Sequence, residues 1–110
     1  MTNNIIYTSM TATGFPDSTL ADEYVRFIEK EVVPRILKAG ALSARVVSLG
    51  NGADFAYESQ YTWPSEEVLK DYRVGVGSEI RNEVLRHFGS KGVNLNPKQG
   101  ILTLEQRVNQ

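Results

Sequence analysis

The chain has 110 residues, the size of one domain that buries roughly two-thirds of the surface of its unfolded chain. Its 12 Lys and Arg residues against 13 Asp and Glu residues leave a net charge of −1, so no charge excess favours a nucleic acid or an anionic membrane surface as a partner. The absence of cysteine excludes disulfides, thiolate metal sites and cysteine nucleophiles. We therefore expect one domain, residues 1–110, whose partners are small molecules or proteins.

Neither a membrane segment nor a signal peptide is indicated. No apolar run approaches the roughly 20 residues that span a bilayer. The first residues have neither a basic start nor an apolar run of signal-peptide length. We expect a cytoplasmic protein without a membrane partner.

The first structured run is residues 5–12, which are rich in Ile, Tyr, Thr and Met and so have strand composition. Apolar residues lie on both faces of this run, which is typical of a strand in the middle of a sheet. The following Gly14 and Pro16 end the strand, and Asp17 or Ser18 is placed to cap a helix.

Residues 20–39 predict an amphipathic helix, because apolar residues recur there at steps of three and four between charged residues. Gly40 ends the pattern. Pro34 lies inside it and would cost about 3 kcal/mol in an ideal helix interior, so we expect a kink or a restart near Val33.

Residues 42–63 predict a β-hairpin around Asn51-Gly52, because a type I′ turn needs positive φ at both central positions. With these two residues as the loop, Arg45 lies directly opposite Glu58. The face toward the helices then carries Val46, Phe55, Tyr57 and Tyr61, and the other face carries Ser43, Arg45, Val47, Ala56, Glu58 and Gln60.

Ser65 followed by two carboxylates predicts the start of a second, longer helix. Gly75 and Gly77 each weaken this helix by roughly 1 kcal/mol relative to Ala, so we expect a loosened turn near Val76. Gly89 is placed for the left-handed residue that often follows a helix.

The last part of the chain predicts a polar loop over residues 90–100 and a strand over residues 101–108. The order strand, helix, strand, strand, helix, strand is that of the ferredoxin-like α+β fold, in which two helices cover one face of a four-stranded antiparallel sheet. The bare face would expose Val47 and Ala56, and we expect a homodimer to cover it.

Four segments resemble an uncharacterised bacterial family of the dimeric α+β barrel superfamily, over roughly residues 5–105. They are Glu31-Val-Val-Pro-Arg-Ile-Leu-Lys-Ala-Gly40, Ser43-Ala-Arg45-Val-Val, Tyr57-x-x-Gln60-Tyr61 and Arg81-x-Glu83-x-x-x-Arg86-His-Phe88-Gly89. The resemblance implies a homodimer whose two sheets pack face to face around a cavity. Superfamily relatives include cofactor-independent oxygenases, haem-degrading enzymes, isomerases and lyases, so the fold alone does not choose an activity.

A polar row on the bare face is the candidate ligand site. It comprises Arg45, Glu58, Gln60 and Thr62, with Trp63 at the mouth of the cavity. Arg45 would pair with an anionic group and Glu58 would be the base. The structural alternative is a cross-strand ion pair that sets the register of the dimer, with Trp63 in the core or the interface.

His87 is the only histidine, which excludes a multi-histidine metal site within one chain. It is either a general base or haem ligand, or a surface residue at a helix end. The spacing between Trp63 and His87 does not match haem-degrading relatives, and we expect no metal or haem cofactor.

Three functional classes follow. The first is a dimer that binds a small organic molecule, the second is a cofactor-independent monooxygenase or isomerase, and the third is a non-catalytic interaction module. RNA recognition is disfavoured, because Asp54 and Glu58 flank the aromatic residues Phe55 and Tyr57 where basic residues would be needed.

Overall fold

The structure, a computed structural model, describes residues 4–50 and 54–106. Its strands are β1 (Ile6–Thr13), β2 (Ser43–Ser48), β3 (Tyr57–Trp63) and β4 (Asn94–Ile101). Its α-helices are α1 (Ser18–Phe27), α2 (Val33–Lys38), α3 (Glu66–Val74) and α4 (Val76–His87), with a π-helical turn at Ile28–Val32 and a 3-10 turn at Gly89–Lys91. This order confirms the predicted ferredoxin-like arrangement.

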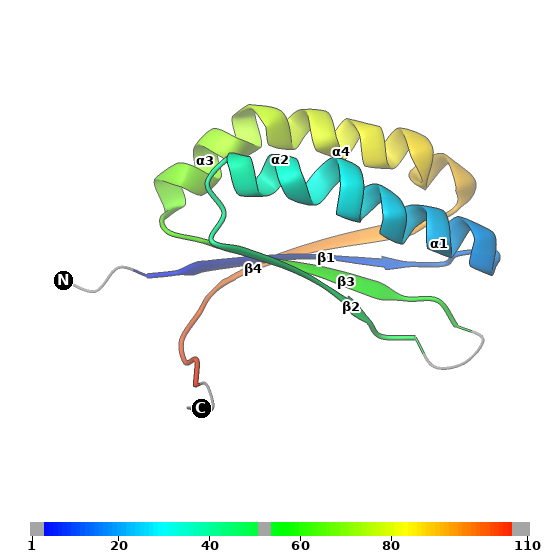
Figure 1. The fold of residues 1–110 in the computed structure, drawn as a ribbon, viewed down its shortest axis with the longest axis horizontal. Helices are drawn as coiled ribbons and strands as arrows, with labels where there is room; N and C mark the ends of the chain where they lie inside the picture. The colour runs from blue at the N-terminus through cyan, green and yellow to red at the C-terminus, as the bar shows by residue number, and fades with distance from the viewer. Residues whose placement is uncertain (1–3, 51–53, 107–110) are drawn as a thin grey trace.

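The four strands form one antiparallel sheet in the order β2-β3-β1-β4, with all helices on one side of it (Figure 1). We call this side the helix face and the other side the open face. The predicted central position of the first strand is confirmed, because β1 pairs with both β3 and β4. Within the described residues, no helix is long and apolar enough to cross a membrane.

The first helical segment has the predicted cap and the predicted restart. The Asp17 carboxylate accepts a hydrogen bond from the Leu20 N–H at 2.9 Å. A π-helical turn then widens the helix before α2 restarts at Val33, which places Pro34 in the first turn of α2, where its missing N–H costs little. The segment ends at Gly40, whose φ of 115° is left-handed and suits glycine.

The second helical segment divides where the glycines predict. Ser65 caps α3 by accepting a hydrogen bond from the Val68 N–H at 3.2 Å, and Gly75 separates α3 from α4. The two helical segments, α1–α2 and α3–α4, are joined by an ion pair between Arg35 of α2 and Glu83 of α4. The pair is bidentate, with both N–O distances at 2.8 Å. These two residues belong to two of the segments that carried the family resemblance.

Two predictions about the last third of the chain are wrong. Gly89 does not have positive φ; the left-handed residue is Gly92, with φ of 91°, because a 3-10 turn follows α4 before the chain reverses. Residues 90–100 are not a loop, because β4 occupies Asn94–Ile101 and pairs with β1 along its whole length. Pro97 is tolerated there since β4 is an edge strand with one unpaired side.

The hairpin register is also wrong, although both faces are assigned correctly for the strand residues. Arg45 lies opposite Gln60 and Val47 lies opposite Glu58, two positions away from the predicted pairing of Arg45 with Glu58. Beyond the strands, the N–H groups of Leu49 and Gly50 both donate hydrogen bonds to the Ala56 carbonyl oxygen, with N–O distances of 2.8 and 3.3 Å. The predicted turn at Asn51-Gly52 lies outside the described residues.

Candidate functional site

The predicted polar row lies on the open face and forms a connected hydrogen-bond network. Arg45 Nε donates to Gln60 Oε1 at 3.1 Å, and Gln60 Nε2 donates to Glu58 Oε1 at 2.9 Å. The Tyr7 hydroxyl donates to Glu58 Oε2 at 3.2 Å. Thr62 is separate from this network and shares a hydrogen bond of 2.5 Å with Ser43. Arg45 and Glu58 are therefore linked through Gln60 and not paired directly.

The electrostatics of this row make Glu58 an acceptor and a weak base. The hydrogen bond from Gln60 is the main cause that lowers the pKa of Glu58, and the bond from Tyr7 adds to it. Partial burial raises the pKa of Tyr7. At neutral pH the row is thus an arginine, an amide, a carboxylate and a phenol whose hydrogen bonds are mutually satisfied, which is typical of a structural network.

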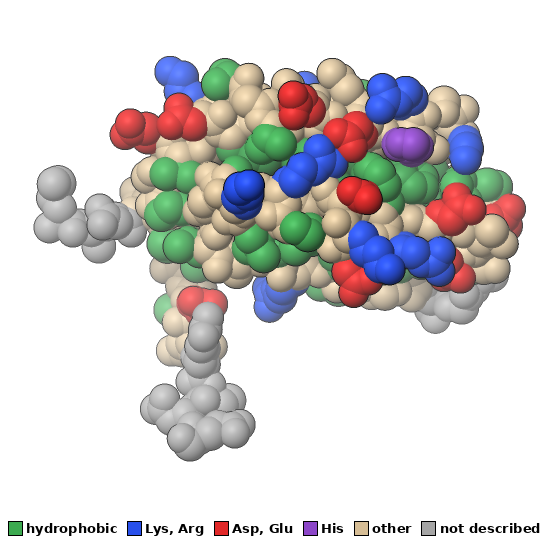
Figure 2. Space-filling model, turned by 45° about the horizontal axis from the view of Figure 1, so that its top comes forward, with side chains coloured by type: hydrophobic (Ala, Val, Ile, Leu, Met, Phe, Trp, Pro, Cys, Tyr) green, Lys and Arg blue, Asp and Glu red, His purple; other side chains and the backbone are tan. Residues whose placement is uncertain are grey.

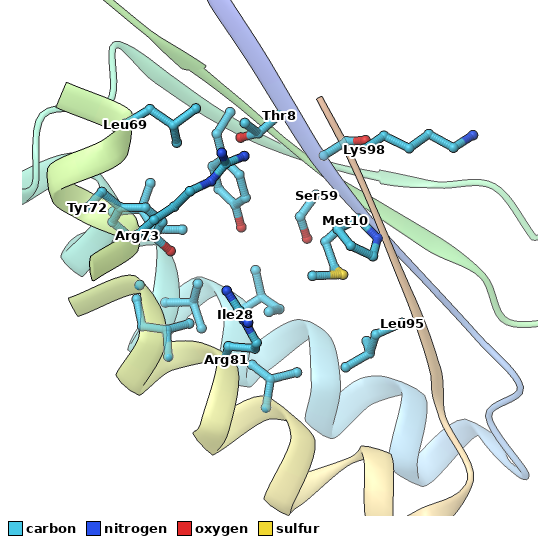
Figure 3. A pocket seen from close by; sticks show the side chains of 18 of the residues that line it. Thr8, Met10, Ile28, Ser59, Leu69, Tyr72, Arg73, Arg81, Leu95 and Lys98 are labelled. Atoms are coloured by element: carbon cyan, nitrogen blue, oxygen red, sulfur yellow. The ribbon is translucent and has the colours of Figure 1, made fainter. Parts of the chain in front are cut away.

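A cavity lies on the other side of the sheet, between the helix face and the helices (Figure 3). Its volume is about 580 Å³, within the usual range for small-molecule sites. Its walls are largely aliphatic and come from both helical layers: Ile28, Val32, Ile36, Leu69, Ile80 and Val84. Arg45, Glu58, Gln60 and Thr62 take no part in this lining.

Trp63 is the one predicted site residue that lines this cavity, and its predicted position beside the polar row is wrong. It lies on the helix face with 1% of its surface exposed. Its Nε1 donates to Thr8 Oγ1 at 2.9 Å, and its ring packs on Tyr72 with centroids 4.7 Å apart. The alternative assignment of Trp63 to the core is the correct one.

Two hydroxyl groups of the cavity are buried without a hydrogen bond of good geometry in the described part of the chain: Ser59 Oγ of β3 and the Tyr24 hydroxyl of α1. Ser59 Oγ is nevertheless close enough to the hydroxyls of Tyr24 and Tyr61 to offset part of the rise in pKa that burial gives them. Ser59 is 1% exposed and Tyr24 is fully buried. Figure 3 shows the Ser59 hydroxyl pointing from the sheet into the space between the layers. Burial raises the pKa of Tyr24 to about 12, so this phenol is protonated at neutral pH.

Two exposed arginines stand at the rim of the same cavity. Arg73 extends from the end of α3 toward the sheet, and Arg81 extends from α4 into the space between the layers (Figure 3). Arg73 Nη2 donates to Gln99 Oε1 of β4. Lys98 also borders the cavity, but its side chain points away from it (Figure 3).

His87 is exposed near the C-terminus of α4, and its ring lies 5.3 Å from that of Phe27, centroid to centroid. It is the one side chain coloured as histidine in Figure 2, on a helix surface where charges of both signs are interspersed. This position fits the alternative of a surface histidine. Within residues 4–50 and 54–106, no three His, Cys, Asp or Glu side chains cluster as metal ligands would.

A family model described as "Domain of unknown function (DUF4286)" matches residues 5–97. The chain belongs to the DUF4286 family. This confirms the resemblance to an uncharacterised family, and no curated protein matches the chain.

Solved structures share the fold of this DUF4286 protein. A dimeric ferredoxin-like protein from an uncultured marine organism is 14% identical with a TM-score of 0.73, over 94% of this chain and 99% of that one. A second such protein from an uncultured marine organism is 10% identical with a TM-score of 0.70, over 94% and 99%. A monooxygenase from the ActVA-Orf6 gene of Streptomyces coelicolor, in complex with nanaomycin D, is 22% identical with a TM-score of 0.58, over 98% and 93%. At these identities the likeness shows the fold alone.

Sequence reasoning missed four residues of the cavity, and a signal for one of them was present. Ser59 stands between Tyr57 and Tyr61 on the face assigned to the helices, where a small polar residue interrupts an apolar row. Tyr24 is indistinguishable from the other apolar positions of its helix. Arg73 and Arg81 resemble any solvated helix residue until the two helices are placed against the sheet.

Proposed function

We propose that this protein binds a small, largely apolar organic molecule in the cavity on the helix face. The observation that carries the proposal is the pair of buried hydroxyls, Ser59 Oγ and the Tyr24 hydroxyl, which make no hydrogen bond of good geometry within the described residues and border a largely apolar cavity. A buried polar group without a hydrogen bond costs about 1–3 kcal/mol, and a ligand with a polar atom at that end would recover this cost.

The lining supports a flat, aromatic ligand. Tyr61, Trp63 and Tyr72 border the cavity together with the aliphatic walls, and aromatic rings favour offset or edge contacts with other rings. The proposed ligand position is therefore the helix face of one subunit, in contrast to the expected site between two sheets.

The chemistry of the lining favours binding over acid–base catalysis. Among the described residues, no Asp, Glu or His lines the cavity. Burial raises the pKa of Tyr24 and of Tyr72 to about 12, so these phenols donate hydrogen bonds at neutral pH and do not accept protons. Support for an oxygenase or isomerase comes from the fold alone, which is shared with monooxygenases such as that of S. coelicolor, and no group in the lining adds to it.

The open face does not suit RNA recognition by stacking. Tyr57 lies on the helix face, where its ring is 5.7 Å from Phe15, centroid to centroid. Phe55 precedes β3 and is not among the residues that pack on the core. Tyr7 is the aromatic residue that the open face offers, and it is hydrogen-bonded to Glu58.

Replacing Ser59 by Ala is expected to separate stability from binding. The variant without ligand should be as stable as the parent or more stable by about 1 kcal/mol, because an unsatisfied hydroxyl is removed. The thermal shift given by compounds that bind the parent should fall. The measurement is a screen of aromatic metabolites by thermal shift, with the fluorescence of Trp63, the only tryptophan, as a second signal from the cavity wall.

Ser9→Ala is the matched control. Ser9 Oγ is also buried without a hydrogen bond of good geometry. Ser9 is among the β1 residues that border the cavity, but it lies opposite Gln60, so its side chain is directed to the open face. This variant should keep the thermal shifts of the parent. Equal losses of ligand shift in both variants, or a parent that responds to no compound, would contradict the proposed site.

We also propose that two copies pair through their open faces. Three observations support this. No helix of residues 4–50 and 54–106 covers this face, and the two marine proteins with this fold are dimeric. The segment after β4 leaves the sheet on the open-face side, with Leu104 74% exposed (Figure 1). The surface is more polar than expected, since Val47 is half-buried amid Arg45, Glu58 and Gln60.

A cytoplasmic location stays a prediction from the sequence.

The dimer is tested by light scattering at micromolar concentration, which should give twice the chain mass of 12.3 kDa. Val47→Glu places a carboxylate directly opposite Glu58 on the open face and should dissociate the dimer. Val46→Glu adds the same charge to the neighbouring residue on the helix face, at a side chain that is already 36% exposed, and should leave the dimer intact. A parent chain that scatters as a 12.3 kDa monomer would overturn the proposal.

A further inference from the structure

We propose that the ligand of the helix-face cavity carries an anionic group, a carboxylate or its equivalent, which Arg73 and Arg81 hold at the cavity mouth. This inference rests on the proposed function, since it names the class of molecule that the cavity binds. It predicts an amphipathic ligand with a polar atom at one end, an aromatic middle and a negative charge at the other end.

The polarity of the cavity lining differs between its buried and its exposed residues. The Ser59 and Tyr24 hydroxyls are buried within it, the middle is aliphatic and aromatic, and the two guanidinium groups lie at the exposed edge. A rigid aromatic acid fits this order, because its ring would take the apolar middle while its charge stays at the solvent edge.

The two arginines come from different helices that meet at Gly75. Arg73 is in the last turn of α3, and Arg81 lies in α4. Figure 3 shows both side chains directed from the helices into the space toward the sheet, and both residues line the cavity. Both helices thus contribute one cation to the lining of the same cavity.

Neither guanidinium is neutralised within the part of the chain that the structure describes. The ion pair there is that of Arg35 with Glu83. Arg73 is oriented by the uncharged amide of Gln99, which fixes the side chain across the gap between α3 and β4 without cancelling its charge. A guanidinium presents a planar set of donors that matches a carboxylate or sulfonate, so two uncompensated arginines, one of them oriented by Gln99, suit an anion.

Two fluorescent probes with the same aromatic skeleton test the inference. 8-Anilinonaphthalene-1-sulfonate carries a sulfonate, and N-phenyl-1-naphthylamine lacks it. The parent protein should bind the sulfonate about tenfold more tightly than the neutral probe, the effect expected of one charge-assisted contact. Arg81→Gln and Arg73→Gln should each remove most of this preference and leave the affinity for the neutral probe unchanged.

Arg86→Gln is the matched control, because Arg86 is an exposed arginine of α4 that does not line the cavity. It removes the same net charge and should leave both affinities as in the parent. Two results would overturn the anion site. One is equal affinity of the parent for the two probes, and the other is an equal loss of affinity for the sulfonate probe in all three arginine variants.

Leu85→Trp separates this failure from failure of the proposed function. Leu85 lines the cavity and is 46% exposed, so a larger side chain there should narrow the mouth at little cost in stability. Leu85→Trp should lower the affinity of the protein for both probes. If both probes bind Leu85→Trp as tightly as the parent, they do not occupy the cavity and the proposed function fails together with the anion site. If Leu85→Trp excludes both probes but Arg73→Gln and Arg81→Gln leave the preference for the sulfonate probe as in the parent, only the anion site fails.

Discussion

Replacement of Trp63 by Ala is expected to lower the free energy of unfolding by about 3–5 kcal/mol, the usual cost of removing a large buried aromatic side chain. Trp63 is 1% exposed and stands where β3, β1 and α3 meet. It packs on the ring of Tyr72 and donates its N–H to Thr8. A domain of this size has a total stability of about 5–15 kcal/mol, so the variant should lose a large part of it.

Trp63→Phe is the control, because it keeps an aromatic ring against Tyr72 and removes the hydrogen bond to Thr8. The free energy of unfolding of Trp63→Phe should fall less, by about 1–2 kcal/mol, because the half-buried Thr8 hydroxyl can form a hydrogen bond to water instead. Urea unfolding followed by far-ultraviolet circular dichroism measures both variants, as the only tryptophan is changed in each. Equal losses in the two variants would show that packing of the indole contributes little.

The faces of the sheet could be predicted from the sequence, but the register could not. Side chains alternate along a strand with a period of two, so the pattern that placed Tyr57 and Tyr61 toward the helices is unchanged by a shift of two residues. Only the connection between the strands distinguishes the two registers. The assumption of a two-residue loop at Asn51-Gly52 therefore gave the right faces and the wrong partner for Arg45.

The last strand was missed because local composition and tertiary context disagree there. Asn94, Pro97 and Gly100 all lower strand propensity, and together they indicate a loop. The edge of the sheet tolerates them, since the other side of β4 has no partner strand, while β1 supplies a partner for every residue of Asn94–Ile101. Such pairing joins positions that are distant in the sequence and leaves no short-range signal.

The candidate site was sought among charged residues, and charge is a poor guide to this cavity. Arg45, Glu58 and Gln60 satisfy one another on the open face, so their polarity needs no ligand to explain it. The informative group is the Ser59 hydroxyl, whose lack of a hydrogen bond of good geometry becomes visible only when the helices are in place. A lone serine on an apolar face is a sequence signal that can be read in this way, but the arginines at the rim have none.

Gly77→Ala is expected to lower the free energy of unfolding by about 1–3 kcal/mol, the usual cost of forcing an extra carbon into a packed site. Helix propensity alone predicts a gain of roughly 1 kcal/mol, as the sequence suggested for this glycine. In the structure, a Cβ at Gly77 would lie 2.7 Å from both Cε2 and the carbonyl oxygen of Tyr72. The backbone carbonyl cannot move aside as a flexible side chain can. The energetic cost of the clash should therefore exceed the gain from the higher helix propensity of alanine.

The physical reason for this glycine is the position of Tyr72, whose ring lies close to α4 while it packs on Trp63 at a tilt and borders the cavity. Asn82→Ala is the control, since it places the same residue at an exposed position of α4 and should be neutral or slightly stabilising. In a Tyr72→Leu background, Gly77→Ala should cost less, with a coupling of about 0.5–3 kcal/mol, because the ring part of the clash is removed. Urea unfolding of the four chains measures the coupling, and a Gly77→Ala variant more stable than the parent would mean that α4 moves away from Tyr72 at little cost.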